Sequence, residues 1–126
     1  MSSAEKAKIM LVEDNKIISM ELKQRLENMG YEVFDVVNSG EEAISKVTEL
    51  SPDLVLMDIK LKGKMDGIEA ADKIHSINNI PIVYVTAYED EDTVKRAKVT
   101  NPKGYLVKPL EEEALHSIIE SSINKQ

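Results

Sequence analysis

The feature of this sequence that most constrains its fold is an alternation between short apolar runs and longer segments with helical periodicity. The apolar runs cover residues 8–12, 32–37, 53–57, 81–85 and 104–107. Three of the five are nearly continuous aliphatic runs, which is typical of strands buried on both faces of a parallel sheet. The run at 32–37 alternates more and suits an edge strand. The pattern predicts an α/β fold, a doubly wound five-stranded parallel sheet with helices on both faces.

The segments between the runs carry start and stop signals of helices. Asn15 is placed to cap a helix that ends at Gly30. Ser39 followed by Glu42 predicts a capping box at the start of the next helix. A third helix is expected from about residue 67 to the turn at 78–79, and the last one after the acidic residues at 111–113.

The fourth helix differs from the others in its composition. Its expected first turn, residues 89–92, is wholly acidic, and it offers little beyond Val94, Ala97 and Val99 for packing. We therefore expect it to be the least firmly anchored element of the fold.

Length and composition indicate one globular domain. The 126 residues, 42% hydrophobic and 31% charged, suffice for a single domain over 1–126 with a core at about 8–123. No apolar stretch is long enough for a membrane span and the start lacks a signal peptide, so we expect a cytoplasmic protein without membrane insertion. The absence of cysteine excludes disulfides and thiolate metal sites. A net charge of -7 argues against direct nucleic-acid binding.

Polar residues follow the predicted strands at one common edge of the sheet. Glu13 and Asp14 follow the first run, Asp58 the third, Thr86 the fourth and Lys108 the fifth. Because parallel strands bring their carboxyl ends to the same edge, we expect these side chains to meet there. Carboxylates that repel one another need a cation or a retained proton, and an all-oxygen donor set favours Mg²⁺.

This set of residues suits phosphoryl transfer. An aspartate can attack phosphorus and form an aspartyl phosphate, whose transferring group carries negative charge on three oxygens. A metal ion, the Lys108 ammonium and the Thr86 hydroxyl are three groups able to neutralise that charge. Each residue alone has an ordinary explanation, as a helix cap, a turn residue or a solvated charge. Their complementary chemistry at one edge outweighs those explanations.

Taken in order, the motifs at the strand ends resemble those of the receiver domain of two-component response regulators: Glu13-Asp14, Asp58, Thr86-Ala87 and residues 104–109. The resemblance extends from residue 8 to residue 123. It implies a flavodoxin-like fold with strand order 2-1-3-4-5.

The resemblance also implies a role for each residue of the site. Asp58 would be the phosphoacceptor, Asp14 a direct Mg²⁺ ligand and Glu13 a ligand acting through water. Lys60 would contribute only its backbone carbonyl to the metal. Lys108 would pair with the phosphoryl oxygens, next to a Lys108-Pro109 peptide that is cis in the family.

Thr86 and Tyr105 resemble the switch pair of the family, in which the hydroxyl moves toward the phosphoryl group and the ring turns inward. The changed face would comprise the fourth helix, fifth strand and fifth helix. The implied phosphodonor is a phosphohistidine on a sensor histidine kinase, and the protein would assist its own phosphorylation and dephosphorylation without being an enzyme. The downstream partner and the oligomeric state stay open, although family members often pair through the face containing the fourth helix.

Two departures from the family pattern concern the site. The loop at residues 59–65 is one residue longer than the commonest family spacing and lacks the usual proline, and the acidic pair is Glu-Asp where Asp-Asp is frequent. Lys60 and Tyr88 lie two residues beyond Asp58 and Thr86, where family members gate the attacking water. Their bulk predicts slow self-hydrolysis of the acyl phosphate.

Two other functions are compatible with the same fold. An aspartyl-nucleophile phosphatase would want a second acid two residues after its nucleophile, and that position is Lys60. A non-signalling flavodoxin-like binding module, such as a flavin binder, is badly matched by an acidic edge. His75 and His116 are expected on helices away from the strand ends, so neither is expected to carry phosphate. The residues therefore favour the phosphoacceptor.

Overall fold

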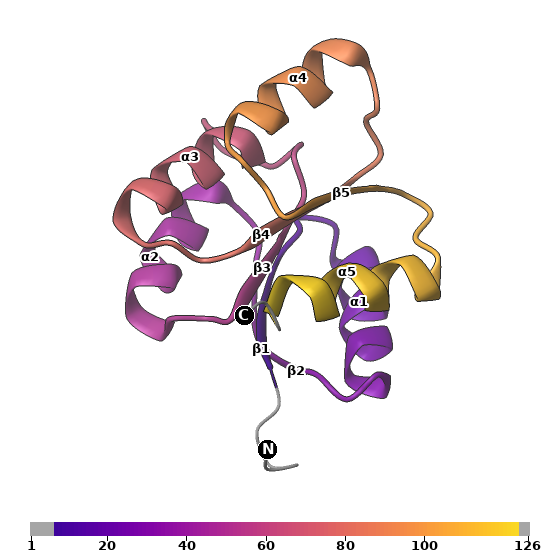
Figure 1. Cartoon of the computed structure of the whole chain (residues 1–126). Helices are drawn as coiled ribbons and strands as arrows, with labels where there is room; N and C mark the ends of the chain where they lie inside the picture. The colour runs from indigo at the N-terminus through magenta and orange to yellow at the C-terminus, as the bar shows by residue number, and fades with distance from the viewer. Residues whose placement is uncertain (1–6, 124–126) are drawn as a thin grey trace.

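Five strands alternate with five helices in the computed structural model, which describes residues 7–123 (Figure 1). The strands are β1 (Lys8–Val12), β2 (Glu32–Val37), β3 (Leu54–Met57), β4 (Ile82–Thr86) and β5 (Gly104–Val107). The helices are α1 (Lys16–Asn28), α2 (Gly40–Leu50), α3 (Gly67–Ile77), α4 (Glu91–Val99) and α5 (Glu112–Ile123). None of the helices in this range has the length and apolarity needed to cross a bilayer.

The strands form one parallel sheet in the order β2-β1-β3-β4-β5. Both the doubly wound α/β class and the order 2-1-3-4-5 are therefore confirmed. As predicted for residues 32–37, β2 is an edge strand. The inner strands β3 and β4 are buried along their whole length, which explains why they read as continuous aliphatic runs.

The helices cover the sheet on both faces (Figure 1): α1 and α5 lie on one face, and α2, α3 and α4 on the other. Successive residues of β1 supply the two apolar cores in turn, because side chains alternate across a strand. Met10 and Val12 pack with residues of α2 and α3, whereas Ile9 and Leu11 pack with residues of α1 and α5. The strands are thereby held with their carboxyl ends at one edge.

The helix caps agree only in part with the sequence prediction. Ser39 caps α2 by accepting a hydrogen bond from the backbone N–H of Glu42 at 3.1 Å. The reciprocal bond is missing, because the Glu42 carboxylate accepts from the N–H of Asn38 instead. The predicted capping box is therefore half formed. A complete box is present at the start of α3, between Asp66 and Glu69.

Helix α4 is anchored differently from the prediction. Ala97 is its one buried side chain, whereas Val99 is 85% exposed, so the expectation that Val99 packs is wrong. Residues two apart on a helix point in nearly opposite directions, and burying Ala97 therefore turns Val99 outward. A polar contact holds the end of the helix: the hydroxyls of Tyr84 and Thr100 lie 2.7 Å apart.

Candidate functional site

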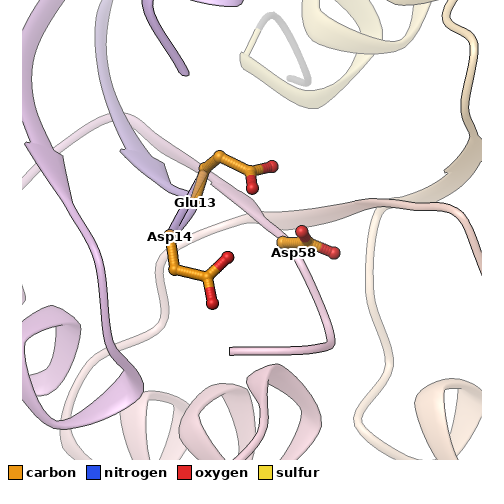
Figure 2. Close-up of side chains that lie close together, drawn as sticks. All are labelled: Glu13, Asp14 and Asp58. Carbon is orange, nitrogen blue, oxygen red and sulfur yellow. The ribbon is translucent and has the colours of Figure 1, made fainter. Parts of the chain in front are cut away.

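Three carboxylates converge at the carboxyl edge of the sheet. Glu13 and Asp14 follow β1, and Asp58 follows the adjacent strand β3; Figure 2 shows the three side chains around one space. Val12 pairs with Met57 in the β1–β3 register, so Glu13 and Asp58, the residues that follow them, lie side by side at the end of the two strands. One oxygen of each carboxylate lies within 4.8 Å of the others. The predicted acidic cluster is thus formed.

The two buried acids of the cluster are each fixed by a backbone N–H. Glu13 Oε2 accepts from the N–H of Asn15 at 3.0 Å, and Asp58 Oδ1 accepts from the N–H of Ile59 at 2.7 Å. These bonds leave Glu13 Oε1 and Asp58 Oδ2 for other partners. Neither bond was predicted, although the expected helix start at Asn15 indicated a free backbone N–H close to Glu13.

Lys108 reaches the acidic cluster from the end of β5. Its Nζ lies 2.8 Å from Glu13 Oε1 and 3.3 Å from Asp58 Oδ2, and its side chain is 19% exposed. The Lys108-Pro109 peptide is cis, as the resemblance implied. The pairing of Lys108 with Glu13 was not predicted, because the sequence placed both residues at one edge without indicating their contact. Lys108 therefore joins the two buried acids.

Burial and repulsion shape the ionisation of these groups. Desolvation by burial and then the charge of Glu13 raise the pKa of the Asp58 carboxyl from 3.8 to about 6, against the opposing effect of Lys108. Desolvation lowers the pKa of Lys108, but the hydrogen bond to Glu13 and the two carboxylate charges outweigh it and raise that pKa overall. Three carboxylates face one ammonium, and this excess of oxygen donors and negative charge fits a Mg²⁺ ion.

Thr86 and Tyr105, the predicted switch residues, share a partner in the loop between β4 and α4. Thr86 is fully buried, and its Oγ1 accepts a hydrogen bond from the backbone N–H of Tyr88 at 3.3 Å. The Tyr105 hydroxyl donates to the carbonyl oxygen of Tyr88 at 2.5 Å. The ring of Tyr105 is half-buried, with its centroid 6.0 Å from that of Tyr84. Both residues are therefore tied to the backbone of Tyr88.

Lys60 lies at the rim of the site rather than among the acids. Its side chain is exposed, and its Nζ is 5.5 Å from the centroid of the Tyr88 ring. A cation at this distance from an aromatic face is attracted by the ring. The two positions that the sequence linked to water access thus contact each other, a contact that no local signal could have revealed.

Comparison with known proteins places this chain near one family of proteins. Residues 9–120 match the family model described as the response regulator receiver domain. The transcriptional regulatory protein PdtaR of Mycobacterium tuberculosis is 36% identical over 118 residues, which are 94% of this chain and 57% of that protein. The chain therefore spans little more than half the length of this curated relative.

Solved structures agree with this similarity. The signal receiver domain of a modulated diguanylate cyclase from Desulfovibrio desulfuricans matches with a TM-score of 0.90 and 40% identity, over 96% of both chains. A chain of the CheX-CheY-BeF3-Mg²⁺ complex from Borrelia burgdorferi matches with a TM-score of 0.87 and 27% identity, over 94% of this chain and 90% of that one.

Proposed function

Because the chain belongs to the response regulator receiver domain family, we propose that Asp58 accepts a phosphoryl group from a sensor histidine kinase. Receiver domains are generally signalling domains rather than catalysts, and the signal here would be a change in the face formed by α4, β5 and α5. One observation carries the proposal, the close approach of three carboxylates and one ammonium. Oxygens of Glu13, Asp14 and Asp58 lie within 4.8 Å of one another, and Lys108 Nζ lies 3.3 Å from Asp58 Oδ2.

The acidic cluster is the proposed Mg²⁺ site. Asp14 and Asp58 would bind the ion directly, Glu13 through water and Lys60 through its backbone carbonyl. When bound, Mg²⁺ would neutralise part of the charge on the transferring phosphoryl group. The all-oxygen donor set supports this assignment, and so does the raised pKa of Asp58, because burial and then the charge of Glu13 disfavour its ionised form and a bound cation would offset both effects.

In the proposed reaction the Asp58 carboxylate attacks the phosphorus of a phosphohistidine. The P–N bond breaks, the imidazole leaves with the electron pair, and an acyl phosphate remains on Asp58. Lys108 would exchange its 2.8 Å contact with Glu13 for a phosphoryl oxygen, since its Nζ already lies beside Asp58. The protein thereby assists its own phosphorylation. In dephosphorylation, water attacks the same phosphorus, the bond from phosphorus to the Asp58 oxygen breaks, and inorganic phosphate and the free carboxylate result.

The switch would act through the backbone of Tyr88. Turning the Thr86 hydroxyl toward the phosphoryl group gives up its bond from the Tyr88 N–H, and turning the Tyr105 ring inward gives up the bond to the Tyr88 carbonyl. Loss of both bonds frees the loop that precedes α4. Because α4 buries a single side chain, this helix is the element that the freed loop can move most easily.

The test of this function is a comparison of amide NMR spectra with and without beryllofluoride and Mg²⁺, the ligands named for the Borrelia burgdorferi complex. We expect chemical-shift changes to concentrate in residues 86–108 and to vanish in Asp58→Ala. Asp72→Ala, which removes an exposed acid of α3, is the matched control and should respond like the wild type. Absence of changes in residues 86–108, or their persistence in Asp58→Ala, would contradict the proposal.

The cellular setting of this function remains predicted. A single domain over residues 1–126, a cytoplasmic location, a downstream protein partner and pairing through the face containing α4 are expectations from the sequence. Direct binding to nucleic acid is not expected of this domain, because its net charge is -7.

A further inference from the structure

The loop between β3 and α3 carries a basic cluster beside the acidic site. Lys60, Lys62 and Lys64 occupy alternate positions of this loop, in a chain whose net charge is -7. All three are exposed. Within residues 7–123, none of them lies at ion-pair distance from a carboxylate. We refer to these three residues as the lysine rim.

The backbone that carries the lysine rim is held in place. Lys62 forms a parallel bridge with Ser39, at the start of α2. The N–H of Lys64 donates to the Glu41 carboxylate at 3.2 Å, and Met65 packs partly buried against the core. The charges of the rim are therefore presented from a fixed part of the surface rather than from a freely moving segment.

The lysine rim is close enough to act on molecules that approach Asp58. A chain advances at most about 3.6 Å per residue, so the Cα atom of Lys62 lies within about 15 Å of that of Asp58. The screening length is about 10 Å at 0.1 M salt and about 30 Å at 0.01 M, so the field of the rim reaches the entrance of the site at low salt and is screened out at about 1 M. With Mg²⁺ bound as proposed, the ion and Lys108 offset the three carboxylates of the site, so the rim adds positive charge beside a site that is close to neutral.

We propose that the lysine rim is a specificity determinant for the phosphodonor: it speeds the arrival of donors with high negative charge and favours them over less charged donors. The inference rests on the proposed role of Asp58 and adds a substrate preference to it. With acetyl phosphate, the Asp58 carboxylate attacks phosphorus and the bond from phosphorus to the acetyl oxygen breaks. Acetate then leaves with the electron pair, and charge balances without a proton.

Two small donors test the preference directly. At neutral pH acetyl phosphate is doubly negative and phosphoramidate carries one net negative charge, with ammonia as its leaving group. Initial rates of Asp58 phosphorylation are measured with each donor in saturating Mg²⁺, at about 0.05 M and about 1 M salt. The variant Lys62→Gln/Lys64→Gln removes two charges of the rim and leaves the contact between Lys60 and Tyr88 in place.

The control variant Lys73→Gln/Lys103→Gln removes the same charge from exposed positions outside the site. At low salt we expect the rim variant to lose about threefold in rate with acetyl phosphate and less with phosphoramidate. At high salt the loss should disappear, and the control variant should match the wild type throughout.

An unchanged rate, an equal loss in the control variant or a loss that persists at high salt would overturn the role of the rim, while leaving Asp58 as the phosphoacceptor. Failure of the wild type to take up phosphate from either donor would contradict the proposed function itself, and the rim proposal with it.

Discussion

Asp58→Asn removes one of three clustered carboxylates while keeping the shape of the side chain. The Asp58 side chain is 9% exposed and lies within 4.8 Å of two other acids. An ionised group in such a place raises the free energy of the folded state. We therefore expect the metal-free variant to be more stable than the wild type at neutral pH, although it would no longer accept phosphate.

The size of the effect follows from the pKa of Asp58, which rises from 3.8 to about 6. Since each pH unit is worth about 1.4 kcal/mol, keeping this group ionised at neutral pH costs about 3 kcal/mol. Asp58 accepts hydrogen bonds from both Ile59 and Lys108, whereas asparagine has only one acceptor oxygen in its side chain. The hydrogen bond that is lost reduces the gain in stability by about 1 kcal/mol. The net gain is about 2 kcal/mol, or roughly 8 °C in melting temperature for a domain of this size.

The pH dependence provides a second readout. The folded wild type holds the Asp58 proton more tightly than the unfolded chain does, because its pKa is raised by folding. The contribution of this proton to the free energy of unfolding is fully present below pH 3.8 and is lost as the pH rises through about 6. The advantage of Asp58→Asn should therefore be largest at neutral pH and shrink as the pH falls through that window.

Urea unfolding followed by far-UV circular dichroism measures this difference, since the chain has no tryptophan. The experiment is run in EDTA and then in Mg²⁺, which should stabilise the wild type more than Asp58→Asn because it binds the native site. Asp72→Asn, at an exposed position, controls for the loss of one negative charge. An Asp58→Asn variant no more stable than the wild type in EDTA at neutral pH would refute the reasoning.

Contacts at the site and beneath α4 give three other testable expectations. Lys60→Asn/Tyr88→Glu should lose label from the phosphorylated protein several-fold faster than the wild type, because the contacting pair shields the acyl phosphate; equal decay would contradict this. Tyr84→Phe should lower the free energy of unfolding by about 1–2 kcal/mol in urea titrations, because it removes the buried hydroxyl 2.7 Å from that of Thr100. Gly67→Ala should lower the free energy of unfolding by about 3 kcal/mol, since its Cβ would clash with the backbone oxygen of Asp58; a wild-type melting temperature would disprove the clash.

The strands were predictable because each one is marked by a local run of apolar residues. The acidic cluster was predictable because all parallel sheets bring the carboxyl ends of their strands to one edge. Buried parallel strands such as β3 and β4 need continuous aliphatic runs, and the sequence contains them. The parallel arrangement then brings the ends of separate strands to one edge. Glu13, Asp14 and Asp58 could therefore be assigned to one site without knowledge of any side-chain contact.

Contacts between loops could not be predicted in the same way. The pairing of Lys108 with Glu13 joins residues 95 positions apart, and it depends on side-chain conformations that no periodic pattern encodes. The half-formed cap of α2 has a similar cause, because the Glu42 carboxylate can reach two neighbouring amides and takes that of Asn38. The outward direction of Val99 followed only once Ala97 was known to face the sheet.

The attachment of α4 is uneven along its length. Ala97 and the Thr100 hydroxyl fasten its carboxyl-terminal end to the sheet, whereas Glu91 and Asp92 in its first turn are exposed. A shift of the preceding loop would therefore rotate the helix about that fixed end, and displacement would be greatest at the first turn. A binding protein that contacts Glu91 would experience most of this movement, while one that contacts Val99 would experience little.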